Sequence, residues 1–391
     1  MANLQCYLGI VLLFYSGLFT TPGVCREVIV TRNSIYPKLR LVSAVFRHGD
    51  RTLEKQIEYY PDDPHKHYDT YPVGDGQLTN AGKDRAYKFG QVLKEMYKSF
   101  LGDVYYQPNI YAQSSAVVRC KMTLQLVLAA LYPPNDVQKW NPHLSWQPAD
   151  FKYTPADKDD ILFSVLCPAY IEAVNNLSDD PTVKMKVNEY SDLMKEMSQR
   201  TGKNMTTISN LFILYHTLIT QVSLNLDLPD WAYDALRDGK LLKAALLQYD
   251  LFNYNDQLIQ YGVGGLLYNI INDMNNKIHG TLKDRRINLF SAHDIHVAAM
   301  LKALKIFDNN IPQFTSSVII ELRENDGDYF VRVLHYLGIP SKVIEVIIPG
   351  CETLCSYDKF VTLISTSIRT DNDPTCLLTR SLPKELEEIL S

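Results

Sequence analysis

The chain has 391 residues, of which 46% are hydrophobic and 21% charged, and its formal net charge is −5. These values are typical of an ordinary soluble globular protein with a sizeable core. The slight acidic excess gives no electrostatic reason to expect nucleic acid or an anionic membrane surface as a partner, so any anion site must be local.

The first 25 residues differ from the rest and are expected to form a signal peptide. An apolar run over residues 8–15 is followed by a Pro-Gly break, which predicts cleavage near Cys25. The run is shorter than the ~20 residues of a membrane-spanning helix, which disfavours an uncleaved anchor. Glycosylation motifs at Asn176 and Asn204 agree with secretion. We expect an extracellular protein, with the lysosomal lumen as the alternative.

An apolar run over residues 39–46, rich in β-branched side chains, predicts a strand buried on both faces. Arg47, His48, Gly49 and Arg51 follow directly, at the strand end where open α/β sheets place their ligands. The two arginines can hold an oxyanion with paired N–H donors, and the histidine can transfer a proton or attack an electrophile. A solvated basic turn is the alternative, but a histidine in this position favours a functional site.

A helix is predicted from Thr79, and a short strand over residues 109–112. A strongly apolar helix follows over residues 117–131, with Arg119 near its N-terminus. A buried arginine is costly unless it meets a negative charge. A bound anion and a buried carboxylate would satisfy Arg119 equally well, and this segment alone does not decide between them.

Helical periodicity dominates residues 140–285, where strands are hard to find. We interpret this region as a mainly helical cap inserted into an α/β core formed by residues 26–139 and 286–391. His216 lies on its longest amphipathic run, residues 208–228, and a lone histidine there is more often a packing residue than a ligand.

The core resumes with a strand at residues 287–292, followed by His293 and Asp294 and then a helix. The N-terminal N–H groups of that helix favour an anion. A hairpin is predicted beyond it, and a last strand over residues 342–348. Together the elements predict an α/β fold with a mostly parallel central sheet flanked by helices. The hairpin strands are expected at residues 318–323 and 329–334.

Three predicted strand ends therefore bring reactive side chains to one edge of the sheet. Three guanidinium groups and two imidazoles around one point would repel each other strongly without a polyanionic ligand, and phosphate is the natural one. Phosphoryl transfer needs this positive charge in its transition state. It also needs a nucleophile, which a neutral imidazole can be, and a proton donor for the leaving oxygen, which a carboxylic acid can be. The residues are Arg47, His48, Arg51, Arg119, His293 and Asp294.

The mature chain keeps five cysteines, an odd number, so in an oxidising compartment four should pair and one should stay free. Cys351 and Cys355 are close enough in sequence for a local disulfide. That leaves Cys167 with Cys376 as a long-range disulfide and Cys120 as a buried thiol.

Three motifs resemble the signatures of the histidine acid phosphatases. They are Arg-His-Gly-Asp-Arg at residues 47–51, Ser-Ser-x-x-x-Arg at 114–119 and Ser-Ala-His-Asp at 291–294. Further stretches resemble insect venom acid phosphatases in particular, so that the resemblance covers nearly the whole mature chain. These stretches are residues 100–103, 124–135, 336–340 and 349–352.

The resemblance implies a phosphoglycerate mutase-like α/β core with a helical cap, no cofactor, and hydrolysis of phosphate monoesters at acid pH. It implies that His48 becomes a transient phosphohistidine and that Asp294 donates a proton to the leaving group. Members of the family often form homodimers, which leaves a homodimer open here. The residues implied to bind the phosphoryl oxygens are Arg47, Arg51, Arg119 and His293.

The sequence departs from the family pattern at two positions. Leu53 stands where proline is usual, which would loosen the loop that enters the site. Val118 stands where mammalian members place an aspartate, which puts in doubt a carboxylate contact that would orient Arg119.

Rival hypotheses are a secreted binding protein on an inactive phosphatase scaffold, a phytase-like or mutase-like enzyme, and a metallophosphoesterase. The last has too few carboxylates for a two-metal site, and we expect no metal. A loop pair, His65 and His67, is expected to be exposed rather than metal-binding. The metallophosphoesterase would use His48, Asp50, His293, Asp294 and His296.

Overall fold

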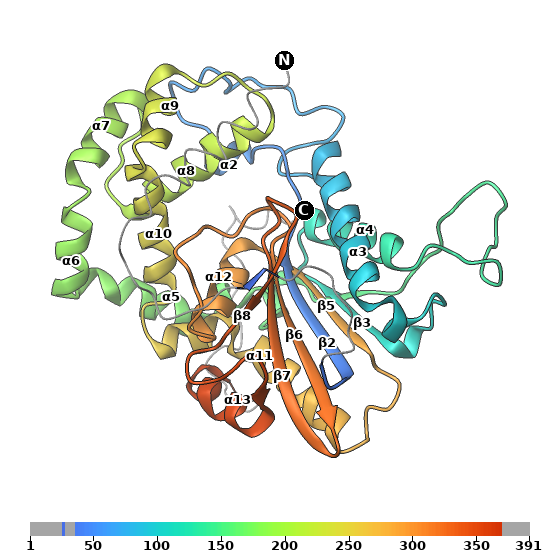
Figure 1. The fold of residues 1–391 in the computed structure, drawn as a ribbon. Coiled ribbons are helices and arrows are strands. Elements are labelled where there is room, and N and C mark those ends of the chain that lie inside the picture. The colour runs from blue at the N-terminus through green and yellow to red at the C-terminus, as the bar shows by residue number, and fades with distance from the viewer. Residues whose placement is uncertain (1–25, 28–35, 370–391) are drawn as a thin grey trace.

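The computed structural model describes residues 26–27 and 36–369, so the predicted signal peptide and Cys376 lie outside the described residues. The described part of the chain forms a nine-stranded mixed sheet with helices on both faces (Figure 1). Along the sheet the strand order is β1-β8-β7-β6-β2-β5-β3-β4, and β9 pairs with β7. The strands are β1 (Arg26–Glu27), β2 (Lys38–Arg47), β3 (Ile110–Ser114), β4 (Lys152–Tyr153), β5 (Ile287–Ala292), β6 (Ser317–Asn325), β7 (Asp328–Tyr336), β8 (Val343–Val346) and β9 (Cys355–Ser356).

The parallel part of the sheet comprises β2, β5, β3 and β4. All six residues of β5 are buried, as expected for a central strand covered on both faces. In the pairing register Arg47 lies opposite Ala292, and Ser114 lies opposite Ser291. The C-terminal ends of β2, β5 and β3 therefore meet at one edge, and the α/β fold with a parallel core is confirmed.

The other part of the sheet is antiparallel. The predicted hairpin is present as β6 and β7, joined at Asn325 and Asp328, and β6 pairs antiparallel with β2. The strand β8 continues this half next to β7. A hairpin needs no crossover helix, so the chain can extend the sheet this way while its parallel strands stay in the centre.

Two helical layers cover the sheet. On one face α3 (Asn80–Leu101) and α4 (Val118–Leu131) bury a cluster that includes Phe89 and Leu124 against β2 and β5. On the other face α11 (Asp256–Ile278), α12 (Asp294–Ala303) and α13 (Tyr357–Ile364) share a core with Leu41 and Phe290. The helix α12 begins at Asp294, whereas the sequence predicts it from Val297, so Asp294 lies in its first turn.

Between β4 and α11 the chain forms several helices that cluster together at one end of the sheet (Figure 1). Helices α7, α8, α9 and α10 bury a hydrophobic core of their own, whereas α11 packs on the sheet. The division of the chain into a core and an inserted cap stays a prediction, and we use "cap" for α5–α10. These are α5 (Pro168–Asn176), α6 (Pro181–Asn188), α7 (Ser191–Thr201), α8 (Ile208–Ser223), α9 (Asp230–Arg237) and α10 (Lys240–Phe252).

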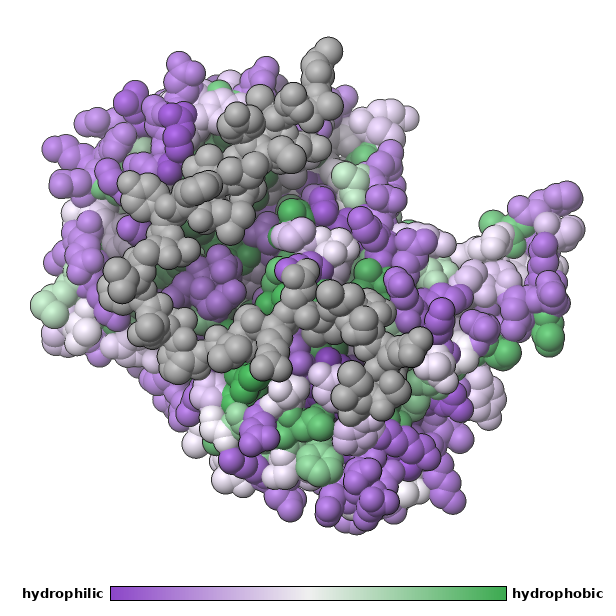
Figure 2. Space-filling model, in the orientation of Figure 1, coloured by the Kyte–Doolittle hydropathy of each residue, from purple (hydrophilic) through white to green (hydrophobic). Residues whose placement is uncertain are grey.

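The visible surface of the cap is mostly hydrophilic, as expected of helices whose apolar sides face inward (Figure 2). Asn176 and Asn204 are both exposed, which is compatible with glycosylation, and their modification stays a prediction. No helix in residues 26–27 and 36–369 is both long enough and apolar enough to cross a membrane.

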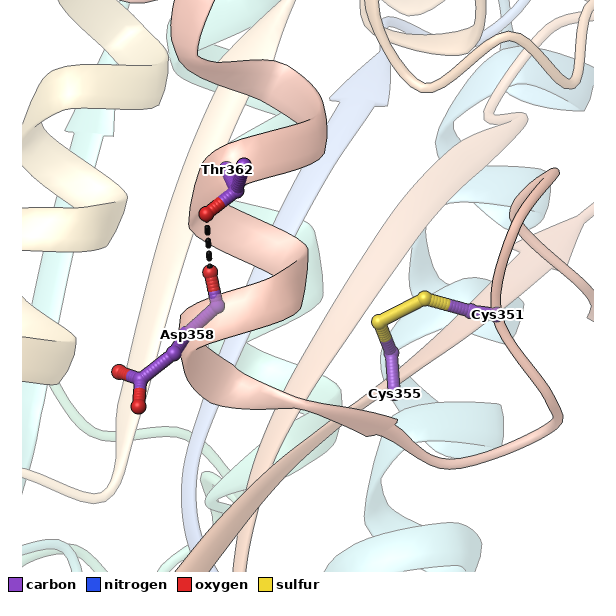
Figure 3. Close-up of a disulfide and its surroundings, with 4 residues drawn as sticks. All are labelled: Cys351, Cys355, Asp358 and Thr362. Atoms are coloured by element: carbon purple, nitrogen blue, oxygen red, sulfur yellow. Dashed lines mark hydrogen bonds between the residues drawn. A yellow bond between two sulfur atoms is a disulfide. The ribbon is translucent and has the colours of Figure 1, made fainter.

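The described cysteines follow the expected pattern. A disulfide joins Cys351 to Cys355 in the loop before α13 (Figure 3), and Cys120 is a buried free thiol. Cys167 is disulfide-bonded as well. Its predicted partner, Cys376, lies outside the described residues, so the pairing of these two cysteines stays a prediction.

Candidate active site

Backbone hydrogen bonds hold the three motifs together at the C-terminal edge of the parallel strands. The His48 amide donates to the Ala292 carbonyl at 3.1 Å, and the Ser115 amide donates to the Ser291 carbonyl at 3.0 Å. The His48 carbonyl accepts from the Thr315 amide at 3.1 Å. The loops after β2, β3 and β5 thus form one floor, on which the predicted site residues lie.

The loop after β2 is fixed by close packing against the start of α3. A Cβ atom on Gly49 would lie 2.3 Å from the Gly82 carbonyl oxygen, and one on Gly82 would lie 2.0 Å from the Asp50 carbonyl oxygen. No side chain fits at either position, so both glycines are required by this approach. The Asp50 carboxylate accepts from Arg85 on α3 at 2.6 Å. Asp50 is therefore a structural anchor of the loop.

His48 is buried, and its surroundings define which ring nitrogen can react. Nδ1 lies 2.8 Å from the Gly49 carbonyl oxygen, which can only accept a hydrogen bond, so Nδ1 carries the proton and Nε2 keeps a lone pair. Burial, and then the charges of Arg119 and Arg47, lower the pKa of His48 well below 6.5. The imidazole is therefore neutral in mild acid.

Three arginines surround His48, and each is paired with a carboxylate. Each also has a buried Nε–H group with no hydrogen-bond partner. A buried unpaired donor costs about 1–3 kcal/mol, so three of them around one imidazole favour binding of an oxyanion. The ion pairs are Arg47 with Asp294 at 2.9 Å, Arg51 with Glu58 at 2.6 Å, and Arg119 with Glu54 at 2.6 Å.

Glu54 and Glu58 were not found from the sequence. Glu54 precedes the short helix α2 (Lys55–Glu58) and Glu58 is its last residue; the only available signal was two acidic residues four apart, shortly after the second arginine. Burial opposes the charge of Glu58, but the Arg51 charge and hydrogen bonds lower its pKa overall. The question left open for Arg119 is answered in this structure by a carboxylate, that of Glu54.

The two departures from the family pattern are both accommodated. Leu53 is fully buried, and its carbonyl accepts from the Gly76 amide at 3.0 Å, so the loop is held in place. The carboxylate contact put in doubt by Val118 is made by Glu54 instead.

His293 lies edge-on to His48, with ring centroids 5.5 Å apart. Its Nε2 is 3.2 Å from the Ser115 hydroxyl, and the Cys120 thiol donates to the Ala292 carbonyl beside it. Burial, and then the charge of Arg119, lower the pKa of His293 well below 6.5. A neutral His293 can still donate one hydrogen bond to an oxyanion.

Asp294 is held at the start of α12 by two contacts. One carboxylate oxygen accepts from the Ile295 amide at 2.8 Å, and the other pairs with Arg47. Burial raises the pKa of Asp294, but the charge of Arg47 reverses this effect and the pKa is lowered overall. Asp294 is thus ionised in the free protein, so the proton that a donor needs has to arrive with the ligand.

The structure also brings a cap residue to this site. His216 was expected to be a packing residue, but the charges of Asp294, Arg47 and Glu58 all act on it. By contrast, His65 is half-buried, with its Nε2 at the Asp227 carbonyl oxygen, and His67 is exposed. In the described ranges no three His, Cys, Asp or Glu side chains are grouped so as to hold a metal ion.

Comparisons with known proteins place these motifs in a family context. The family model described as the histidine phosphatase superfamily (branch 2) matches residues 38–336. Venom acid phosphatase Acph-1 of Apis mellifera is 39% identical over 88% of this chain and 88% of its own length. Lysosomal acid phosphatase of Xenopus laevis is 29% identical, covering 89% of this chain and 81% of its own. The solved structure of the Klebsiella sp ASR1 phytase is similar with a TM-score of 0.65 and 18% identity, over 89% of this chain and 100% of that one.

Proposed function

The chain belongs to branch 2 of the histidine phosphatase superfamily, and we propose that it hydrolyses phosphate monoesters in acid through a phosphohistidine on His48. It is a phosphatase, as the family and the relatives named acid phosphatase support. The likeness to a phytase supports the fold alone, since the identity is 18%. The residue roles that follow are part of the proposal.

The observation that carries the proposal is the state of His48. Its Nδ1–H is bound by the Gly49 carbonyl, which leaves the Nε2 lone pair for attack on phosphorus. The low pKa keeps this lone pair available in acid, where an ordinary imidazole would be protonated. The same loop packing that requires Gly49 and Gly82 fixes the direction of the ring.

The arginines would bind the phosphoryl oxygens. Arg47, Arg51 and Arg119 each present an unpaired buried Nε–H, and His293 adds a neutral N–H donor. Charge on the equatorial oxygens of the transferring group would be stabilised by donors that are already in place and need no reorganisation. The carboxylates that pair with these arginines hold them in position.

Asp294 would deliver the proton to the leaving oxygen. A phosphoryl dianion next to Arg47 offsets the positive charge that keeps Asp294 ionised, so its pKa rises when substrate binds. The phosphorus–oxygen bond of the ester breaks as the Nε2–phosphorus bond forms, and the departing oxygen takes the Asp294 proton. In the second step the carboxylate would accept a proton from the water that attacks the phosphohistidine.

We also propose that the protein is secreted, with a lysosomal location as the alternative. The relatives named venom acid phosphatase and lysosomal acid phosphatase support one or the other. Cleavage of a signal peptide and glycosylation at Asn176 and Asn204 belong to the same proposal, and mass spectrometry of the secreted protein would test them.

Rapid acid-free quenching with labelled substrate tests the mechanism. The wild type should form a phosphoenzyme that is labile in acid and stable in base, and His48→Ala should form none while its melting temperature stays unchanged. Turnover of an aryl phosphate at pH 5 separates an enzyme from an inactive binding protein. If turnover proceeds with no trapped phosphoenzyme, direct attack by water is the better mechanism.

A further inference from the structure

Two buried side chains of the cap lie against Asp294. Tyr249 on α10 is fully buried, and its hydroxyl is 3.3 Å from Nε2 of His216 on α8. The helix α10 packs against both α8 and α12 (Figure 1), and Asp294 lies in the first turn of α12. The Asp294 side chain is near enough to the same Tyr249 hydroxyl to contribute to its raised pKa. Asp294, Tyr249 and His216 therefore follow one another from the site into the cap.

The two cap residues are uncharged over the range in which an acid phosphatase works. Burial raises the pKa of Tyr249 well above 10, and the negative charge of Asp294 adds to this effect. Burial lowers the pKa of His216 to about 4, against a smaller opposing effect from Asp294. The Tyr249 hydroxyl thus keeps its proton, which it can donate to the Asp294 carboxylate, and its oxygen can accept from His216 Nε2 when that nitrogen carries the proton.

In the proposed reaction Asp294 needs a second contact to hold it in place. The Arg47 guanidinium holds the Asp294 carboxylate, but bound phosphate competes for that charge. Asp294 then gains a proton, and the ion pair that fixed it is weakened. A general acid that is free to rotate transfers its proton poorly, because proton transfer needs the donor within hydrogen-bond reach of the leaving oxygen.

A tyrosine hydroxyl can bind a carboxyl group in both protonation states. Tyr249 donates to the Asp294 carboxylate when that group is ionised. When Asp294 is protonated on one oxygen, the Tyr249 hydroxyl can still donate to the other oxygen, so the Asp294 proton stays available for the leaving oxygen. The neutral His216, with its proton on Nε2, can donate to the Tyr249 oxygen in both states.

Resting on the proposed role of Asp294, we propose that Tyr249 and His216 are positioning residues. They hold Asp294 through both of its protonation states and thereby set how strongly the rate depends on the leaving alcohol. Packing alone does not account for a hydroxyl here, since Tyr249 lies in a small apolar cluster with Ala245, Ala298 and Ile311, where phenylalanine would fill the same space.

The cap offers a matched control. Tyr170 on α5 is also buried, but its hydroxyl donates to the Phe252 carbonyl at 3.1 Å, and burial alone raises its pKa. No charged group of the site acts on it. Tyr170→Phe therefore removes a buried cap hydroxyl without touching Asp294.

The test compares an alkyl phosphate, glycerol 2-phosphate, with an aryl phosphate, 4-nitrophenyl phosphate, whose phenolate leaves without much help. Tyr249→Phe should lower kcat/KM about tenfold for the alkyl ester and less than about twofold for the aryl ester. His216→Leu should act in the same way, His216→Gln should restore part of the alkyl activity through its amide, and Tyr170→Phe should change neither. An equal loss on both esters in Tyr249→Phe would mean a merely structural role and would overturn the inference.

Asp294→Asn, measured with the same two esters, separates this inference from the proposed function. If the substitution slows hydrolysis of both esters equally, the donor role of Asp294 is wrong and the positioning role of Tyr249 and His216 is wrong as well. If it slows the alkyl ester selectively while Tyr249→Phe does not, the donor role stands and only the positioning role is rejected. In the supporting outcome, adding Tyr249→Phe to Asp294→Asn has no further selective effect on the alkyl ester.

Discussion

The Glu54 carboxylate lies 2.6 Å from the Arg119 guanidinium and is its ion-pair partner. These residues come from different loops, one before α2 and the other at the start of α4, so the pair also joins two walls of the site. Because the charge of Arg119 acts on His48, Glu54 influences both the oxyanion site and the nucleophile.

Glu54→Gln is expected to strengthen binding of inorganic phosphate. The amide keeps the shape and a hydrogen-bond acceptor for Arg119 but removes a negative charge that opposes the ligand. The inhibition constant for phosphate should fall roughly three- to tenfold, which corresponds to about 1 kcal/mol. The matched comparison is Glu54→Ala, which also loses the contact. A higher inhibition constant in Glu54→Gln would show that the charge of Glu54 orients Arg119 more than it competes with phosphate.

Gly82→Ala should nearly abolish activity, because the new Cβ would lie 2.0 Å from the Asp50 carbonyl oxygen and would displace the loop that carries His48. We expect a loss of at least about 100-fold in kcat/KM, as for other misplaced catalytic groups. The control is Gly262→Ala on α11, where the nearest atom to the new Cβ is 3.9 Å away. That change should leave the rate intact and stabilise the helix by about 0.5–1 kcal/mol, measured by thermal unfolding. Equal activity in both variants would contradict the close approach.

Cys120 should resist alkylation in the native protein. Its thiol is fully buried, and burial raises its pKa to about 11, so very little thiolate is present at pH 8. Iodoacetamide should label it only after denaturation, as determined by peptide mapping without reduction. The same map tests the predicted Cys167–Cys376 disulfide. A labelled Cys120 in the folded protein would mean that the floor under His293 opens in solution.

The parallel core and the meeting of the three motifs could be predicted because they depend on short-range patterns. A buried apolar run followed by a reactive residue marks a strand end, and parallel strands bring their C-terminal ends to one edge. The six predicted site residues accordingly lie together around His48. The hairpin β6–β7 was also predicted, but not that β6 would pair with β2, since edge pairing leaves no local signal.

The partners of the site residues could not be predicted in the same way. Tyr249 and His216 reach the site because the cap docks on the core, and docking depends on contacts between segments far apart in the sequence. For example, Thr217 on α8 donates to the Glu58 carbonyl at 2.9 Å, across 159 positions of the chain. On its own helix, His216 looks like any other buried residue.

The last prediction concerns the pH dependence of kcat/KM, which is controlled by the protonation of His48, Asp294 and the substrate. His48 has a pKa well below 6.5, caused by burial and the neighbouring arginines, so loss of the nucleophile by protonation sets in only at a pH well below 6.5. Asp294 has a lowered pKa, because the Arg47 charge outweighs burial, so in the free protein it carries no proton at pH 5. The fall in activity at higher pH therefore cannot come from Asp294 losing a proton in the free protein. A phosphate monoester loses its second proton at about pH 6. Below that pH the substrate binds as a monoanion, which can bring the proton that Asp294 needs.

The value of kcat/KM should therefore fall as the pH rises through the second pKa of the substrate, which gives an acid optimum. Measured from pH 4 to 8 with two monoesters whose second pKa values differ, the falling limb should move with the substrate. A limb that stays at one pH for both esters would mean that a group of the free enzyme controls it. In that case Asp294 would have to be protonated before substrate binds, against the effect of its ion pair with Arg47.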